Sequence, residues 1–429
     1  MKFDLLHPAD QIVMIMKRIY EGGMTTTSGG NLSIRDGNGD VWITPGGIDK
    51  GCLSRSDIMC VKPDGTAVGP HKPSSELPFH LKIYETRPDA EAVLHAHPPG
   101  LVAFSIVTNI PDTSIIPNAH QVCGKIGFAP YDVPGSAALG KKIAKKFAEK
   151  CDIVMMENHG LVTLGADLFQ AFMRFETLEY CARLQINALR LGNMVSLTPE
   201  QLALAWKKKN APLEEFIPHM HTSRERDVRR EMCEFIHRAY DQHLFTSTQG
   251  TFSCRLDDDV FLITPYGVDR KYMEPSDLLL IQKGLGEAGK IPSRSVLVHR
   301  DIYKKHPGTN AVIIAHPPHI MAYGLSRTPF DSRTIPESYI MLRDIAVLPY
   351  GTNITRPDLI SDTVSPAVPL IMVENDFLIV TGDSLLRVYD CLEVAEFSAK
   401  ALLSATVLGK VSPITEEEVG DLKQAFDLP

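Results

Sequence analysis

Residues 92–99 read AVLHAHPP, and residues 311–318 read AVIIAHPP. The histidines that precede the two proline pairs lie 316 − 97 = 219 positions apart. In the first copy, His95 and His97 alternate along a run of apolar residues that predicts a β-strand. Residues i and i+2 of a strand point to the same face, so both imidazoles are placed to bind one ion from one side. The stretch therefore indicates a metal site and a duplicated chain.

Two further motifs recur at almost the same spacing. ITPGG at 43–47 returns as ITPYG at 263–267, an offset of 220, and ENH at 157–159 returns as END at 374–376, an offset of 217. A nearly constant offset indicates that one unit was copied whole, and each copy is too long for a solenoid repeat. The length of 429 residues also exceeds one ordinary domain. We predict two domains, at residues 1–215 and 221–429.

The segment between the copies, from about residue 192 to 221, has charged, proline-bearing flanks. Thr198-Pro199 is typical of a helix start, because threonine caps the first turn and proline suits its first position. We expect this helix to pack as a terminal helix of the first unit.

Composition is that of a soluble globular protein, with 44% hydrophobic and 22% charged residues and a formal net charge of −8. The negative charge favours neither a nucleic-acid partner nor an anionic membrane surface. The first 23 residues carry acidic side chains and a broken apolar run, so we expect neither a signal peptide nor a membrane span. Eight cysteines without Cys-x-x-Cys spacing favour a reducing compartment, and the cytoplasm is the expected location.

Within each copy, short β-rich runs alternate with helical patterns, which predicts an α/β class. Strands are expected at 41–44, 92–97 and 152–156 of the first copy. Apolar residues at three- and four-residue spacing predict helices at 10–20, 78–87, 137–150 and 166–191.

A third imidazole, His159, stands in the ENHG motif at 157–160. Neutral imidazoles bind zinc and similar ions well, and three protein ligands leave one position open for chemistry. His95, His97 and His159 are therefore the candidate metal ligands.

Three polar loops accompany the histidines. PSSE at 73–76 precedes a predicted helix, so its residues suit a capping box, or an anion site with Glu76 facing the metal. The loops at 27–31 and 44–47 combine glycine with neutral donors, a mixture that can cradle phosphate. The candidate anion-binding residues are Ser28, Gly30, Asn31, Thr44, Gly46, Ser74 and Ser75.

These motifs together resemble the class II aldolase/adducin family. The resemblance rests on SGGNLS at 28–33, ITPGG at 43–47, PSSE at 73–76, RPD at 87–89, HAHPP at 95–99 and ENHG at 157–160. They occur in family order across residues 1 to about 215, and a decayed version covers most of the remainder. The resemblance implies two tandem three-layer α/β/α domains with mainly antiparallel central sheets.

The resemblance also implies a function. His95, His97 and His159 would hold a divalent ion, zinc or manganese, Glu76 would be the acid/base residue, and the polar loops would hold a substrate phosphate. A Lewis-acid ion stabilises the enediolate left when a carbon–carbon bond of a ketose breaks. The expected activity is cleavage of a ketose 1-phosphate. Decarboxylation of a 3-keto sugar acid and 4-epimerisation of a ketose phosphate remain open, although glutamate at position 76 favours aldolases over epimerases. A non-catalytic, adducin-like assembly role is the remaining alternative.

The second copy departs from this pattern. The counterparts of His95, His159 and Glu76 are Ile314, Asp376 and Ser295, and His316 alone survives from the ligand set. We expect no metal there, and a scaffold role is the simplest reading.

A sharper reading gives the second copy a share in catalysis. Family members form four-unit rings in which a neighbour's tyrosine protonates the departing group. Aligning 117–120 with 336–339 places Tyr339 where the first copy has His120. We expect a homodimer that forms a four-domain pseudo-ring, with Tyr339 lent to the metal-bearing site.

Polar residues on two helices recur in both copies. His80 and His299 are expected in the core or beside the site, and Glu179 and Glu396 in solvated or capping positions.

Overall fold

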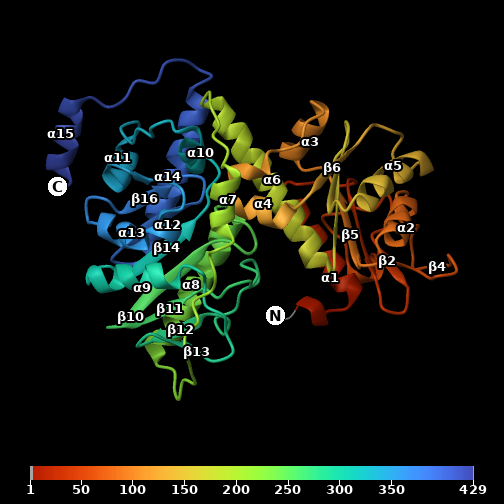
Figure 1. The fold of residues 1–429 in the computed structure, drawn as a ribbon, viewed down its shortest axis with the longest axis horizontal. Helices are drawn as coiled ribbons and strands as arrows, with labels where there is room; N and C mark the ends of the chain where they lie inside the picture. Colours follow the sequence, from red (N-terminus) through yellow and green to blue (C-terminus); the bar gives the residue numbers. More distant parts are fainter. Residues whose placement is uncertain (1–2, 429) are drawn as a thin grey trace. The chain divides into compact units, whose positions relative to one another are not determined.

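The computed structural model describes residues 3–428 and divides the chain into two compact units (Figure 1). The first unit comprises the chain up to Thr113 together with Asn118–Arg183. The second comprises Ser114–Pro117 and the chain from Leu184 onward. Both units are built around a central β-sheet, and each is described in turn.

The sheet of the first unit has eight strands among the described residues, in the order β4-β3-β2-β1-β5-β8-β7-β6. Neighbouring strands are antiparallel except for β6 and β7, which are parallel. Strand β5 lies at the centre and is buried throughout, because alternate residues face helices on both sides of the sheet. The strands are β1 (Asn31–Arg35), β2 (Val41–Ile43), β3 (Met59–Val61), β4 (Ala67–Val68), β5 (Ala92–Ala96), β6 (Ile126–Ala129), β7 (Ile153–Met156) and β8 (Leu161–Gly165).

Helices cover both faces of this sheet, which gives three layers. One face packs Phe79, Ile83 and Phe147 of helices α2 and α5 against Val93 and other strand residues. Figure 1 shows α2 and α5 along the strands of this sheet. On the other face lie α1 and α6, where the Arg18 guanidinium stacks 4.6 Å from the centre of the Phe172 ring. The helices are α1 (Pro8–Glu21), α2 (Leu77–Thr86), α3 (Pro99–Ile106), α4 (Pro117–Cys123), α5 (Ala137–Ala148) and α6 (Leu168–Arg190).

The second unit repeats this plan. Its strand order, β9-β13-β12-β11-β10-β14-β17-β16-β15, reproduces that of the first unit with one strand, β9, added at the edge. The parallel pairs are β15–β16 and β13–β9. The strands are β9 (Glu215–Phe216), β10 (Thr251–Asp257), β11 (Val260–Ile263), β12 (Leu279–Gln282), β13 (Leu285–Glu287), β14 (Ala311–Ala315), β15 (Ala346–Leu348), β16 (Leu370–Val373) and β17 (Phe377–Gly382).

The helices of the second unit also form two outer layers. Ile302 of α9 and Ile360 of α13 belong to the core on one face. On the other face α8 and α14 meet, with the rings of Phe235 and Tyr389 4.8 Å apart. The helices are α7 (Pro199–Ala205), α8 (Ser223–Asp241), α9 (Val296–Lys305), α10 (Ile320–Ser326), α11 (Pro336–Leu342), α12 (Thr352–Thr355), α13 (Pro357–Thr363), α14 (Leu385–Ala405) and α15 (Glu416–Ala425).

The fold prediction is confirmed: two tandem three-layer α/β/α units with mainly antiparallel sheets. The four helices and three strands predicted for the first copy all form, with ends within about two residues of those expected from periodicity. The helix predicted at Thr198-Pro199 also forms, with Thr198 as its cap. Its expected place was wrong, because α7 and β9 belong to the compact second unit and β9 pairs with β13. The boundaries 1–215 and 221–429 stay a prediction about the two sequence copies.

A buried carboxylate caps the same helix in each unit. Glu179 of α6 is 1% exposed and accepts hydrogen bonds from the backbone N–H groups of Gly100 and Leu101, in the first turn of α3. Glu396 of α14 does the same for α10, through the N–H groups of His319 and Ile320. Of the two expected roles, capping is the one observed for Glu179. The cap holds the helix that directly follows the HAHPP stretch.

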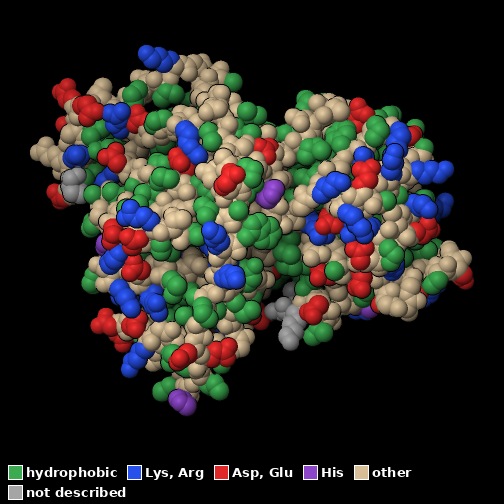
Figure 2. Space-filling model, in the orientation of Figure 1, with side chains coloured by type: hydrophobic (Ala, Val, Ile, Leu, Met, Phe, Trp, Pro, Cys, Tyr) green, Lys and Arg blue, Asp and Glu red, His purple; other side chains and the backbone are tan. Residues whose placement is uncertain are grey.

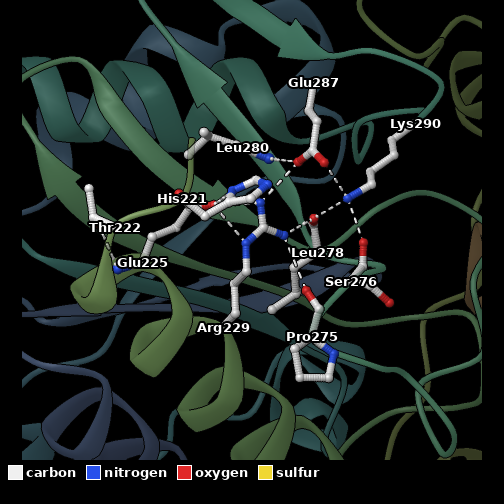
Figure 3. Close-up of polar contacts among 10 residues, drawn as sticks. All are labelled: His221, Thr222, Glu225, Arg229, Pro275, Ser276, Leu278, Leu280, Glu287 and Lys290. Atoms are coloured by element: carbon white, nitrogen blue, oxygen red, sulfur yellow. Dashed lines mark hydrogen bonds and ion pairs between the residues drawn. The ribbon is translucent and has the colours of Figure 1, made fainter. Parts of the chain in front are cut away.

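Arg229 forms a buried ion-pair network in the second unit (Figure 3). Its guanidinium donates to Glu225 of α8 at 2.8 Å and to Glu287 of β13 at 3.0 Å. It also donates to the backbone carbonyls of Pro275 and Leu278, so all its contacts lie within one small region. The network attaches α8 to the β12–β13 edge of the sheet.

Acidic and basic side chains are interspersed on the face shown in Figure 2. Within residues 3–428, no helix combines the length and apolar character needed to cross a membrane.

Candidate metal centre

Three histidines of the first unit converge at one end of its sheet. Ligand atoms of His95, His97 and His159 all lie within 4.8 Å of one another. His95 is the fourth residue of β5, His97 follows the end of that strand, and His159 stands in the turn between β7 and β8. The turn reaches the other two residues because β8 pairs with β5, with Leu161 opposite Ala96.

Two glycines allow the close approach of these segments. A side chain at Gly160 would place its Cβ 2.5 Å from the Ala96 carbonyl oxygen and 2.7 Å from the His97 ring. Gly30 has φ of +74°, and its Cβ would lie 2.8 Å from the His95 carbonyl oxygen. Only glycine fits at either position without displacing backbone, and Gly30 also needs the left-handed conformation.

Two ring nitrogens of this cluster are buried without a partner, and for one of them a lone pair is fixed. His95 Nδ1 lies 2.9 Å from the Leu161 carbonyl oxygen, and a carbonyl only accepts, so this nitrogen carries the proton. His95 Nε2 therefore holds a lone pair, and it is buried without a partner, as is Nε2 of His97. Burial and the neighbouring imidazoles lower the pKa of His95 and His97 to about 3, so both rings are neutral. Burial also lowers the pKa of His159.

Glu76 faces this cluster from the N-terminus of α2. It is 8% exposed, and its Oε2 lies 3.2 Å from His95 Nε2 while its Oε1 lies 4.0 Å from His159 Nε2. Lone pairs of a carboxylate and of a neutral imidazole repel each other at that distance, whereas a shared cation attracts both. The donor set, three neutral imidazoles and one carboxylate, thus fits a divalent metal ion.

A chain of hydrogen bonds leads from the core to Glu76. Asn31 Nδ2 donates to Glu76 Oε2 at 2.7 Å, and Asn31 Oδ1 lies 2.5 Å from His80 Nε2. His80 is fully buried, and its Nδ1 lies 2.7 Å from the Ser33 hydroxyl, which lies 2.7 Å from the Tyr84 hydroxyl. The expectation of a core or site-supporting place for His80 is confirmed. Its link to Glu76 through Asn31 was not foreseen, since a single sequence shows no pairing between positions 31 and 80.

The predicted anion loops lie near this centre, but several of their polar groups already have partners. Thr44 Oγ1 accepts from the N–H of Leu32, and Ser74 Oγ accepts from the N–H of Glu76. The N–H of Gly46 donates to the backbone carbonyl of Lys72. An isolated bridge between Pro45 and Pro73 joins two of the loops. Ser28 and Ser75 have exposed side chains.

A buried cation also supports these loops. Lys50 is 2% exposed, and its ammonium donates to the Pro45 carbonyl at 2.5 Å. Burial lowers its pKa. The sequence indicates this role only through position, because Lys50 comes shortly after ITPGG. Arg270 occupies the matching position in the second unit, and its guanidinium donates to the Pro265 carbonyl.

Tyr339 belongs to the second unit, on helix α11. Its side chain is partly exposed.

Comparison with known proteins places each unit in the same group. A model of the Class II Aldolase and Adducin N-terminal domain matches residues 10–186 and again residues 230–403. An L-fuculose phosphate aldolase of Methanococcus maripaludis is 36% identical over 174 residues, 41% of this chain and 93% of that protein. A 3-oxo-tetronate 4-phosphate decarboxylase of Haemophilus influenzae is 34% identical over 177 residues, 40% of this chain and 84% of that protein. A solved L-fuculose 1-phosphate aldolase is 32% identical and covers 47% of this chain and 95% of its own, with a TM-score of 0.43.

Proposed function

The chain belongs to the Class II Aldolase and Adducin family, and from this membership we propose that its first unit is a metal-dependent lyase that cleaves a ketose 1-phosphate. The observation that carries the proposal is the convergence of three neutral imidazoles and the Glu76 carboxylate around one point. Enzymes of this class depend on a divalent metal. Zinc is our proposed ion, with manganese as the alternative, because zinc binds imidazole well and accepts four ligands.

His95, His97 and His159 would hold the ion, which would act as a Lewis acid on the carbonyl and hydroxyl oxygens of the substrate. The backbone carbonyl of Leu161 orients His95 by accepting its Nδ1 proton. Asn31 holds Glu76 Oε2, while Glu76 Oε1 has no hydrogen-bond partner within the described chain. Oε1 is therefore the oxygen placed to exchange a proton with the substrate.

In the proposed cleavage, a base removes the proton of the hydroxyl group beside the scissile bond. The C–O bond becomes a carbonyl, the carbon–carbon bond breaks, and its electron pair passes to the fragment that bears the original carbonyl. That fragment then takes up a proton. We assign proton transfer to Glu76 and to Tyr339 of the second unit. Ser28 and Ser75, whose side chains are exposed, are the proposed hydroxyl donors to the phosphate, together with backbone groups near Gly30, Asn31, Thr44, Gly46 and Ser74.

Decarboxylation of a phosphorylated 3-keto sugar acid is the second candidate. It is favoured by the decarboxylase relative, which is nearly as similar to the first unit as the aldolase relative. The same residues would serve it, because loss of CO₂ also leaves an electron pair beside a carbonyl. Epimerisation is less supported, since position 76 is glutamate. An adducin-like assembly role without catalysis would leave the intact histidine set unexplained.

The test supplies purified, metal-loaded full-length protein with a panel of ketose 1-phosphates and with 3-oxo-tetronate 4-phosphate. Release of dihydroxyacetone phosphate that stops on chelation supports the aldolase, and release of CO₂ supports the decarboxylase. Glu76→Gln should lose activity while keeping its metal. Glu157→Gln is a matched control, because Glu157 lies in the His159 turn and accepts from the Tyr131 N–H instead. No product from any substrate, with metal bound, would contradict both activities.

We further propose a homodimer arranged as a four-domain pseudo-ring, and a cytoplasmic location. The location rests on the eight cysteines, all of which are free thiols.

A further inference from the structure

The second unit keeps the backbone frame of the metal centre but changes its side chains. Thr251 pairs with Ile314 across β10 and β14 as Asn31 pairs with His95 across β1 and β5. The β16–β17 turn lies beside the end of β14 because Leu378 pairs with Ala315. The frame therefore brings the counterparts of the first-unit site together at the same end of the sheet. They are Ile314, His316, Asp376 and Ser295.

Two cations occur at this end of the sheet, at positions where the first unit has none. Arg294 stands in place of Ser75, and its guanidinium lies 5.3 Å from the centre of the Tyr266 ring. Lys208 follows helix α7, and its ammonium lies 5.4 Å from the centre of the Phe377 ring, next to Asp376. Both aromatic contacts hold a cation without neutralising its charge. We call Lys208, Arg294, His316, Asp376 and Tyr350 the second-unit cluster.

Two polar groups of this region lack protein partners. His316 Nδ1 and the Tyr350 hydroxyl are unpaired, although both residues are only 9% exposed. The Asn353 side chain lies beside Asp376 and is a hydrogen-bond partner of its carboxylate. Within the described part of the chain, neither Lys208 nor Arg294 lies within ion-pairing distance of a carboxylate. Buried polar groups of folded proteins nearly always have partners, so an unpaired set gathered at one place indicates a ligand.

The charges of the second-unit cluster favour an anion. Burial, followed by Lys208 and Arg294, lowers the pKa of His316 to about 3, so that ring is neutral. Burial raises the pKa of Asp376, while Lys208 and Arg294 oppose the rise. Burial also lowers the pKa of the Lys208 ammonium, while Asp376 opposes that change. Two basic side chains thus face one carboxyl group. The net positive charge complements a phosphate, and the unpaired imidazole and phenol are suitable partners for hydroxyl groups.

We propose that the second unit binds a phosphorylated sugar or sugar acid without a metal ion. Arg294 takes the phosphate, because a guanidinium fork matches two phosphate oxygens. Lys208 supplies the point charge that a divalent cation supplies in the first unit. His316 and Tyr350 bind the sugar hydroxyls. The site is separate from the lyase centre and does not depend on its activity.

The experiment uses the full-length chain after chelation and measures binding of dihydroxyacetone phosphate by isothermal titration calorimetry. One ligand per chain should still bind, both in the wild type and in His95→Ala. Inorganic phosphate should compete, and glycerate, which has a carboxylate and hydroxyl groups but no phosphate, should compete less. Because each cation makes charge-assisted hydrogen bonds, Arg294→Ser and Lys208→Ala should each weaken binding about tenfold or more. Lys207→Ala, which changes the exposed neighbour of Lys208, should leave binding unchanged.

The proposal fails if chelation or His95→Ala abolishes binding, since the ligand would then occupy the first unit. It also fails if phosphate does not compete, or if Arg294→Ser and Lys208→Ala bind as the wild type does. Thermal unfolding of each variant separates lost binding from lost folding. If Arg294→Ser does not fold, Arg294→Lys keeps the charge, removes the fork and should still weaken binding. Loss of lyase activity with retained binding would contradict only the proposed function.

Discussion

Asn31 and Thr251 occupy equivalent positions in the two units, but they make different hydrogen bonds. Asn31 Oδ1 only accepts, so His80 Nε2 must be the donor in their 2.5 Å contact. This fixes the amide so that its nitrogen faces Glu76. Thr251 has no such amide, and its hydroxyl lies 2.9 Å from that of Ser293. His299 keeps the bond to Ser253, but its Nε2 is buried without a partner.

His80→Ala should therefore lower turnover while metal content stays the same, because Glu76 loses the support of its orienting amide. Loss of a residue that supports a metal ligand or acid/base group typically costs about 10- to 100-fold. Turnover and bound metal are measured on the same preparation. His299→Ala is the matched control, since it breaks the same serine contact in the second unit. Equal loss of turnover in the two variants would show that His80 acts only through stability.

At the scale of elements, buried charged side chains join helices to neighbouring segments of the chain. Each of these charges is paired with an opposite charge or with backbone groups. Arg229 is 6% exposed and joins α8 to two carboxylates and two backbone carbonyls near the β12–β13 edge (Figure 3). Glu179 and Glu396 use carboxylates to cap α3 and α10. Removing one partner from such a set leaves the others buried without compensation.

Arg229→Met should destabilise the second unit by about 3 kcal/mol, because the buried Glu225 and the half-buried Glu287 would lose the cation they share. Lys290, 2.6 Å from Glu287, would still compensate part of the charge. Chemical denaturation followed by circular dichroism measures the change. Arg230→Ala, an exposed neighbour on the same helix, should change stability by less than about 0.5 kcal/mol. Adding Glu225→Gln and Glu287→Gln to Arg229→Met should recover part of the loss. A further loss in the triple variant would argue against uncompensated charge as the cause.

At the scale of the whole molecule, the two copies share a fold while their sites differ in charge. The first unit gathers three neutral imidazoles and a carboxylate, and the second gathers two cations and one aspartate. A bound ion stabilises only the unit that holds it, because stabilisation by a ligand requires binding to the folded form.

Chelation should therefore lower the unfolding temperature of the first unit and leave that of the second unchanged. At a free metal concentration of about 100 times Kd, the lost stabilisation is about 2.7 kcal/mol. Differential scanning calorimetry with and without chelator measures both transitions. His95→Ala should remove the effect of the chelator, and a chelator effect that persists in this variant would place the ion elsewhere.

The proposed sharing of Tyr339 also belongs to this scale. Tyr339→Phe should lower turnover without loss of metal, because the substrate would lose one of the two groups assigned to proton transfer during cleavage. If one chain lends Tyr339 to its partner, mixing inactive His95→Ala chains with Tyr339→Phe chains should restore activity. Random pairing makes half of the dimers mixed, each with one intact site, which gives about a quarter of wild-type activity. Normal turnover in Tyr339→Phe would contradict the assignment, and absence of restoration on mixing would contradict sharing between chains.

Local sequence was sufficient for much of the fold. Helices such as Ala137–Ala148 and strands such as Ala92–Ala96 follow from hydrophobic periodicity, because a helix or strand repeats its buried face at a fixed interval. The offset near 219 predicted two copies of one fold, and the spacing of His95 and His97 predicted that both side chains lie on the same face of a strand. The unit to which α7 belongs was predicted wrongly, because the sequence of a short helix between two units does not indicate which unit it packs against.

Contacts between distant positions depended on packing. His159 is 62 residues beyond His97 (159 − 97), and it reaches the cluster because β8 pairs with β5. The same holds for Asn31 between His80 and Glu76, and for Lys208 beside Asp376. Periodicity within an element says which face a residue occupies, but strand order and turn geometry decide which faces meet. The tertiary structure therefore decides the character of each site. Burial removes these polar groups from water, so each must be paired with another group of the chain or with a ligand.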